Sequence, residues 1–307
     1  MTKLETHIHQ SSEKGFSSVS TLITGSSHAV LIDPPFLVPD AESIVQWIQK
    51  TAPNHQLVAV FITHHHPDHY FSANPILEAH PSAVLYAAPY VCTAIGREYD
   101  EKVVYWPSVV GADMVPARPR KPTPYPYSFF RLDGEVVVLM GPVQGDSVDH
   151  TLFWIPGAKT VVCGDAIYAR STHVWAEEIE TPAIWSAWMT TLDTIESLGA
   201  EKIIPGHLEA GWEMDAAQDM AYMRKYLNLF KDKIIAKAPK KAPVDEIYNT
   251  FKDAFPKADK NLDFYLGHLS NQFGDGGEVW EENKLHQVGN KGPEDLEGYV
   301  LPLPKGL

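Results

Sequence analysis

Residues 61–70 read FITHHHPDHY. They close a run of apolar and β-branched residues that starts at Gln56, a composition typical of a buried strand, and the polar cluster begins where this strand should end. His64 and His66 are two positions apart at the end of the strand, so their side chains point to the same face. Pro67 then turns the chain. We expect the chemistry of the protein to be centred on this turn.

The same turn carries two more metal-binding side chains, Asp68 and His69. Imidazole and carboxylate ligands together suit zinc, with iron or manganese as alternatives. Such a crowd of ligands in one turn predicts room for two metal ions rather than one. A histidine run also occurs in affinity tags, but a tag lies at a terminus, whereas this run follows an apolar strand inside the chain.

The spacing H-x-H-x-D-H over residues 64–69 resembles the signature of the metallo-β-lactamase superfamily. The resemblance covers about residues 15–240. It implies an α/β fold, an αββα four-layer sandwich with the metals at one edge. We accordingly expect a catalytic domain over residues 1–240, and a C-terminal helical extension and tail over residues 241–307 that packs on or near the same domain.

Two later motifs match the rest of the family pattern, and a third is compatible with it. Asp165 ends an apolar strand in the phrase GDAIY, and the resemblance makes it the aspartate that bridges both metals. His207 lies in the phrase IIPGH, which is similar to the element whose histidine binds the second metal. Asp33 also ends an apolar strand. The resemblance gives Asp33 a supporting role behind the metal site, and simple turn capping is the alternative.

One phrase departs from the family pattern. The third ligand of the first metal is usually a histidine in T-P-G-H-T-x-G-H/S, whereas residues 145–151 read GDSVDHT. With the strand that starts at Thr151 as a ruler, Asp146 falls on the ligand position and His150 on the last position. Asp146 is therefore the expected ligand. His150 is its alternate through a shifted loop, and otherwise a supporting residue behind the ligands.

The residues next to these motifs suggest a substrate pocket. Asp68 is expected to handle a proton in addition to binding a metal. Tyr168 resembles the tyrosine that lactone-cleaving relatives place near the metals to hold a carbonyl oxygen, and packing in the core is the alternative. His173 and Trp175 are expected to line the pocket. The proline-rich residues 116–127 form a loop that either borders the pocket or bridges the two halves of the fold. Further aromatic residues suit a partly apolar substrate, and packing in the core is the alternative for most of them: Tyr125, Tyr127, Phe129, Phe130, Trp185 and Trp188.

Hydrophobic periodicity predicts strands and helices in both halves of the chain. Strands are expected over residues 4–9, 17–24, 28–33, 56–62, 83–87, 135–140, 151–155, 160–163 and 202–205. Helices are expected over residues 40–51, 183–198, 215–237, 243–255 and 262–273, near residue 71, and from Pro89 onward. Residues 102–110 are expected to form a weaker strand.

The composition sets the remaining expectations. The 307 residues include 25 basic and 39 acidic side chains, and the formal net charge of −14 disfavours nucleic acid as a partner. No apolar run approaches the roughly 20 residues that cross a bilayer, and the N-terminus lacks a secretion signal. Cys92 and Cys163 are too few for a disulfide framework. We expect a cytoplasmic protein that binds a small-molecule substrate and no membrane, with a homodimer left open.

The resemblance and the ligands together predict an enzyme, a dinuclear metal-dependent hydrolase with two Zn²⁺ ions. Its metal-bound hydroxide would open a small ester, lactone or amide (lactam) bond. The family also hosts other chemistry, so the alternatives are an isothiocyanate or other xenobiotic hydrolase, a glyoxalase II-like thioesterase, and a sulfur dioxygenase with one iron. A binding or scaffold module held together by metals is the non-enzymatic alternative, and an intact ligand set argues against it.

Overall fold

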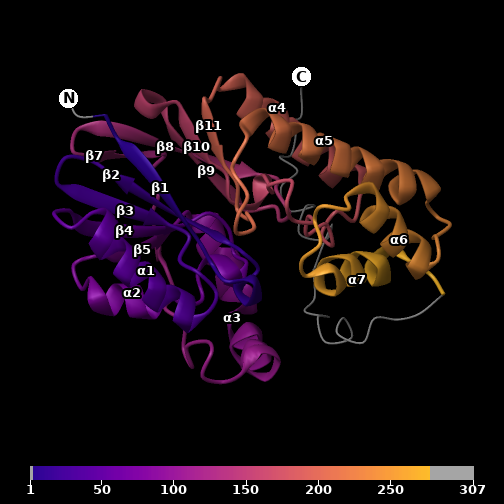
Figure 1. Ribbon diagram of the computed structural model, residues 1–307, viewed down its shortest axis with the longest axis horizontal. Helices are drawn as coiled ribbons and strands as arrows, with labels where there is room; N and C mark the ends of the chain where they lie inside the picture. Colours follow the sequence, from indigo (N-terminus) through magenta and orange to yellow (C-terminus); the bar gives the residue numbers. More distant parts are fainter. Residues whose placement is uncertain (1–2, 277–307) are drawn as a thin grey trace, which may run out of the picture.

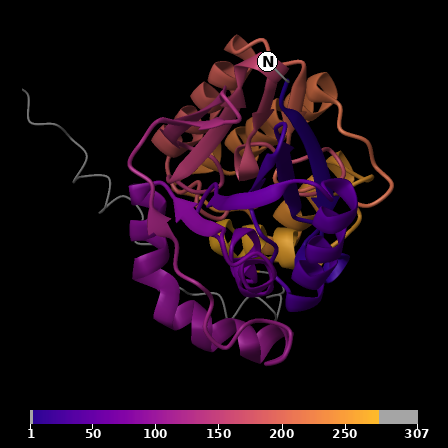
Figure 2. The same cartoon turned by 90° about the vertical axis from the view of Figure 1, so that its left-hand side faces the viewer.

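The computed structural model describes residues 3–276, in which two β-sheets are stacked face to face. Helices cover the outer face of each sheet, so the layers run helix, sheet, sheet, helix (Figure 1). A view turned by 90° shows the indigo to magenta helices on one side of the strands and the orange helices on the other (Figure 2). The predicted αββα sandwich is confirmed.

The first sheet has the strand order β1-β2-β3-β4-β5-β6. Its strands are β1 (Glu5–Gln10), β2 (Val19–Thr24), β3 (His28–Ile32), β4 (Gln56–Ile62), β5 (Val84–Ala87) and β6 (Thr123–Pro124). The first three strands form an antiparallel meander, and the strands from β3 to β6 are parallel. Parallel strands need crossover connections. The helices that provide them are α1 (Val38–Thr51), α2 (Ala73–Ala79) and α3 (Pro89–Val110).

The second sheet has the strand order β11-β10-β9-β8-β7. Its strands are β7 (Phe129–Leu132), β8 (Glu135–Val143), β9 (His150–Ile155), β10 (Thr160–Val162) and β11 (Lys202–Ile204). The pairs from β7 to β10 are antiparallel, whereas β10 and β11 are parallel and are connected through α4 (Pro182–Ser197). Helix α5 (Ala216–Lys233) packs with α4 on the outer face of this sheet.

Alternation along the strands explains why the layers stay together. In β3, Val30 and Ile32 face the second sheet, whereas Leu31 between them faces the helices. Between the sheets, the ring of Phe61 stacks on that of Phe130, with 5.1 Å between centroids, and meets Phe153 edge-on at 5.5 Å. A strand that is apolar on both faces is buried on both faces, and this fixes its register in the sandwich.

The described part of the C-terminal extension, residues 241–276, packs on the rest of the chain. It forms α6 (Val244–Ala254) and α7 (Leu262–Phe273). Phe251 and Leu266 lie in the same apolar cluster as Tyr226 of α5. The predicted tail over residues 277–307 lies outside the described residues. Of the helices in residues 3–276, none combines the length and the apolar character needed to cross a membrane.

Two secondary-structure predictions are wrong. Residues 102–110 form the second half of α3 rather than a strand, because the buried positions of this segment recur every three or four residues, as in a helix. They are Val91, Ile95, Tyr99, Lys102 and Trp106. Strand β7 was not predicted. It follows the proline-rich loop and pairs with β8 in a hairpin at the edge of the second sheet. The turn is Asp133-Gly134, both with positive φ, a local hairpin signal from which this strand could have been predicted.

Several strands of both sheets end at one edge of the sandwich. The segments that follow β3, β4, β10 and β11 carry Asp33, His64, Asp165 and His207 respectively. Residues that are far apart in the sequence are therefore collected at this edge, where loops held by a rigid scaffold can carry chemistry.

Candidate metal centre

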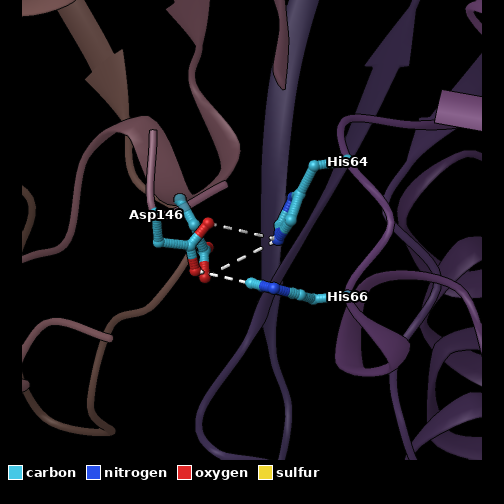
Figure 3. A group of neighbouring side chains, drawn as sticks. His64, His66 and Asp146 are labelled. Carbon is cyan, nitrogen blue, oxygen red and sulfur yellow. Dashed lines mark hydrogen bonds and ion pairs between the residues drawn. The ribbon is translucent and has the colours of Figure 1, made fainter. Parts of the chain in front are cut away.

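The first group of candidate ligands joins the two sheets. His64 and His66, which follow β4, face Asp146, which follows β8 (Figure 3). His66 Nδ1 lies 3.1 Å from Asp146 Oδ2, and His64 Nε2 lies 3.8 Å from Asp146 Oδ1. Together with Asp165, these residues offer ligand atoms that all lie within 4.8 Å of one another. The structure thus places Asp146 among the ligand atoms.

The second group consists of Asp68, His69 and His207, whose ligand atoms also lie within 4.8 Å of one another. Asp68 Oδ2 is 3.5 Å from His69 Nε2 and 3.3 Å from His207 Nε2. Asp165 contacts this group as well, because its Oδ1 lies 3.1 Å from His69 Nε2 and its Oδ2 lies 3.0 Å from His207 Nε2. Asp165 therefore lies between the two groups, where a bridging ligand belongs.

The donor atoms of the first group fit a cation. His64 Nε2, Asp146 Oδ1 and Asp165 Oδ1 are buried, and none has a hydrogen-bond partner within residues 3–276. Such atoms are costly to bury unless something satisfies them. Burial lowers the pKa of His64 well below its ordinary value, which keeps the imidazole neutral and its lone pair open to a metal. Burial, together with the charge of Asp165, raises the pKa of Asp146, and a cation would relieve this repulsion.

His150, the alternate ligand, lies behind the first group. Its ring stacks on that of His64, with 4.1 Å between centroids and 16° between planes. Its Nε2 lies 3.2 Å from Asp146 Oδ1, and its Nδ1 lies 3.1 Å from the carbonyl oxygen of Ser147. Burial lowers the pKa of His150 to about 4, so the ring is neutral. Its Nε2, like that of His64, is buried without a hydrogen-bond partner within residues 3–276, so a ligand role for His150 stays the alternative to support of Asp146.

Asp33 lies behind the second group. Its Oδ2 is 3.1 Å from His69 Nδ1, and its two oxygens accept hydrogen bonds from the backbone N–H and the hydroxyl of Thr63, both at 2.8 Å. The backbone of Asp33 is left-handed, with φ of 57°, a conformation that aspartate tolerates better than most residues. The carboxylate thereby fixes the orientation of the His69 ring, as expected for a residue that supports a ligand.

Two carboxylates at the site were not predicted. Glu178 Oε1 lies 2.9 Å from His66 Nε2, on the side of the ring away from Asp146. Burial alone would lower the pKa of His66, but Asp146 and Glu178 raise it well above its ordinary value. Asp149 lies 2.8 Å from His65 Nδ1. Asp149 stands in the phrase that was already singled out, whereas Glu178 lies in an irregular segment without any periodic signal.

The sequence of this chain matches a known protein family. Residues 14–207 match the model described as the metallo-beta-lactamase superfamily. The chain belongs to this superfamily. A relative described as hydroxyacylglutathione hydrolase, from Francisella tularensis subsp. novicida (strain U112), is 24% identical over 226 residues, which are 73% of this chain and 75% of the relative.

Solved structures of the superfamily share the fold of this chain. A metallo-beta-lactamase from Pontibacter korlensis has a TM-score of 0.52 and 14% identity, over 74% of this chain and 96% of that chain. DIM-1 metallo-beta-lactamase exposed to ceftazidime has a TM-score of 0.51 and 18% identity, over 74% of this chain and 93% of that chain. At these identities the likeness shows the fold alone.

A cavity opens onto the candidate ligands of this metallo-β-lactamase superfamily member. Its lining includes polar groups of the candidate centre: His66, Asp68, Asp146, Asp165, Tyr168 and His207. It also includes aromatic rings: Phe16, Phe36, Trp106, Trp175, Phe264 and Tyr265. Trp175, expected in the pocket, is thus among the lining residues. An apolar lining with a few convergent polar groups is typical of a small-molecule site.

Tyr168, which follows Asp165 in the sequence, contacts two of the candidate ligands. The Tyr168 hydroxyl lies 2.8 Å from Asp146 Oδ2 and 2.5 Å from Asp165 Oδ2. Its ring stacks on that of His207, with 4.9 Å between centroids and 4° between planes. A hydroxyl has one proton to donate, and here both neighbouring acceptors are carboxylates of the centre. Tyr168 thus holds the ligands in place as well as lining the cavity.

Other residues expected near the pocket lie elsewhere in the structure. His173 packs in the core, with its Nδ1 3.3 Å from the Tyr226 hydroxyl, and it is not among the residues that line this cavity. Trp188 is buried and donates to the carbonyl oxygen of Ala166. The lining also contains none of residues 116–127, whose loop bridges the two halves of the fold. Local sequence does not reveal which aromatic rings a long-range fold brings to a cavity.

Because His173 is buried, we expect the free energy of unfolding to decrease in acid. Burial lowers its pKa to about 4, whereas an exposed histidine titrates near 6.5. Above pH 6.5 the ring is neutral in the folded and in the unfolded protein. Between about pH 6.5 and about pH 4 only the unfolded chain binds the proton. The free energy of unfolding therefore decreases by roughly 3 kcal/mol in all as the pH falls through this range. Urea unfolding of chelator-treated protein at pH 7.5 and 5.0 should show a smaller pH effect in His173→Gln.

The control for this measurement is His7→Gln, because His7 is only partly buried. Treatment with a chelator removes the competing loss of metal in acid. An unchanged pH effect in His173→Gln, or the same reduction in both variants, would contradict the assignment to His173.

Proposed function

We propose that this protein is a dinuclear metal-dependent hydrolase that opens a small ester, lactone or amide (lactam) bond. The observation that carries the proposal is the position of Asp165, whose carboxylate contacts His69 and His207 and also belongs to the ligand group of His64. One carboxylate between two ligand groups is the arrangement that a pair of metal ions requires. Zinc suits these nitrogen and oxygen ligands, with iron or manganese as alternatives.

The residues divide into two ligand sets. His64, His66 and Asp146 would hold the first ion, and Asp68, His69 and His207 the second, with Asp165 shared between them. When bound, the ions supply Lewis acidity, which lowers the pKa of water and polarises an acyl oxygen. No serine or cysteine nucleophile is needed: Cys163 is fully buried, and burial raises the pKa of its thiol.

The side chains of the centre then handle protons and orientation. Asp68 lines the cavity and is partly exposed, and although burial raises its pKa, His69 and His207 hold it below the ordinary value. Its carboxylate can accept a proton from the attacking water and return it to the leaving group. The water oxygen forms a bond to the acyl carbon, the bond from that carbon to oxygen, nitrogen or sulfur breaks, and no oxidant or reductant is required.

A glyoxalase II-like thioesterase is the second candidate, because a curated relative is described as hydroxyacylglutathione hydrolase. The lining of the cavity gives it less support. Lys102 is the single basic side chain apart from histidines among the lining residues, and it already lies 3.6 Å from Glu98. Glutathione carries two carboxylates, and an aromatic wall fits a less polar acyl group better.

Hydrolysis by zinc-loaded protein should separate these candidates. We expect turnover of at least one member of a panel of phenyl acetate, δ-valerolactone, nitrocefin and S-lactoylglutathione. Removal of metal with dipicolinate should abolish the activity, and zinc should restore it, because several kcal/mol of transition-state stabilisation depend on the ions. Protein with about two ions per chain that turns over no panel member would contradict the proposal. A single iron with oxygen uptake would instead indicate a sulfur dioxygenase.

A further inference from the structure

The cavity wall contains a hydroxyl group that forms no hydrogen bond with any other described residue. Tyr265 of α7 lines the cavity beside Asp68, Asp165 and His207, and only 4% of the residue is exposed. Its ring meets that of His207 edge-on, with 6.4 Å between centroids. Within residues 3–276 its hydroxyl has no hydrogen-bond partner. A tyrosine hydroxyl that is largely buried normally finds a partner, so this one is open to a ligand.

Packing holds the Tyr265 ring in place. It meets Phe16 edge-on at 6.5 Å and lies 5.5 Å from Phe264. Phe264 in turn stacks on Phe16 at 4.4 Å and on Trp175 at 5.3 Å. A hydroxyl on a ring that is already held in place loses little conformational entropy when it donates to a ligand. Such preorganised donors stabilise a developing charge effectively.

The start of α7 is tied to distant parts of the chain. Asn261, which precedes the helix, donates from Nδ2 to the carbonyl oxygen of Glu13 at 3.2 Å. Tyr248 of α6 donates to Asp263 in the first turn of α7 at 2.9 Å. Both contacts fix α7 against the cavity, and with it the position of Tyr265.

Tyr265 differs from the other tyrosine of the cavity in what its hydroxyl can do. The proton of Tyr168 lies between Asp146 and Asp165, so this residue has none to spare for a substrate. Tyr265 lines the same cavity, and its ring also contacts that of His207, but its hydroxyl has no such acceptor within residues 3–276. Of the two, Tyr265 is the hydroxyl that can donate to a substrate oxygen.

We propose that Tyr265 is a catalytic residue whose hydroxyl donates a hydrogen bond to the acyl oxygen of the substrate as negative charge develops on that oxygen. This inference rests on the proposed hydrolase function. The rings beside it, Phe16, Trp175 and Phe264, fit an acyl group that is itself apolar or aromatic. Tyr265 lies outside residues 14–207, which match the family model, so α7 adds a donor that this match does not include.

The test compares zinc-loaded Tyr265→Phe with wild-type protein. The substitution keeps the ring and removes the hydroxyl alone. With the best substrate of the panel, kcat/KM should fall about 10- to 100-fold, as expected for one donor to a developing oxyanion. Binding of methyl phenylphosphonate, a tetrahedral anion that resembles the intermediate, should weaken by a similar factor in calorimetry, whereas metal content and Tm should stay at the wild-type values.

The matched control is Tyr86→Phe, which removes a hydroxyl from β5, outside the residues that line the cavity, and should leave kcat/KM unchanged. The inference is overturned if Tyr265→Phe keeps kcat/KM and phosphonate affinity within twofold of wild type, or if it loses metal, since that would indicate a structural role. A wild-type protein that neither turns over the panel nor binds the phosphonate would overturn the proposed function, and the role of Tyr265 with it.

Discussion

Asp146→Ala protein is expected to bind close to one metal ion per chain, whereas His150→Ala protein should still bind close to two. Asp146 offers its oxygens 3.1 Å from His66 Nδ1 and 3.8 Å from His64 Nε2, within the first ligand group, and His150 lies behind it. Loss of a ligand also removes Lewis acidity, so the activity of Asp146→Ala should fall by roughly a thousandfold or more, equivalent to several kcal/mol.

Elemental analysis of both variants and wild type, after dialysis against zinc, measures this difference. A residue that supports a ligand typically contributes about 10- to 100-fold to metal affinity, so His150→Ala should bind two ions more weakly in a competition with a chelator. Loss of an ion from His150→Ala alone would show that the loop is shifted and that His150 is the ligand. Asp146→Asn is a useful control, because it removes the negative charge of the carboxylate and keeps the shape of the side chain.

Gly206→Ala should destabilise the protein and disrupt the metal centre at the same time. A Cβ at this position would lie 1.8 Å from Asp165 Oδ1 and 2.7 Å from the carbonyl carbon of Gly164. The contact with backbone cannot be relieved by a rotamer change, so Asp165 or the backbone next to Gly206 must move. We expect a loss of more than about 3 kcal/mol in the free energy of unfolding, or roughly 5 °C in Tm, and a metal content well below two ions.

Gly96→Ala is the matched control for this substitution. Gly96 lies inside α3, and a Cβ there would meet nothing within 4 Å. The same change should therefore stabilise the protein by roughly 0.5–1 kcal/mol, the usual gain of alanine over glycine within a helix. Thermal unfolding and elemental analysis of both variants give the comparison. Wild-type metal content and Tm in Gly206→Ala would contradict this account of the site.

The sandwich and much of the centre could be predicted because their signals are local. Each predicted ligand after His64–His69 follows an apolar strand or stands in a short motif, and strands that share an edge bring such residues together. The expectation that Asp146 rather than His150 is the ligand rests on the start of the next strand as a ruler, since position along a strand fixes which side chain reaches the site.

The rest of the site depends on contacts between distant segments. Glu178 comes from an irregular stretch, and Tyr265 comes from a helix whose amphipathic pattern says only that one face is buried. His173 was assigned to the pocket from nearness in sequence, but the chain turns it into the core against Tyr226. The β-branched residues of α3 favoured a strand, and only the spacing of its buried side chains identifies a helix.

The bond from Asn261 to Glu13 joins the last described helix to a turn near the start of the chain, across 248 positions of sequence. The candidate ligands all lie between these two points. The lining of the cavity, in contrast, also draws on the start of the chain and on the last described helix, through Phe16, Phe264 and Tyr265. Substitutions in these distant segments can therefore alter the cavity while the candidate ligands stay the same.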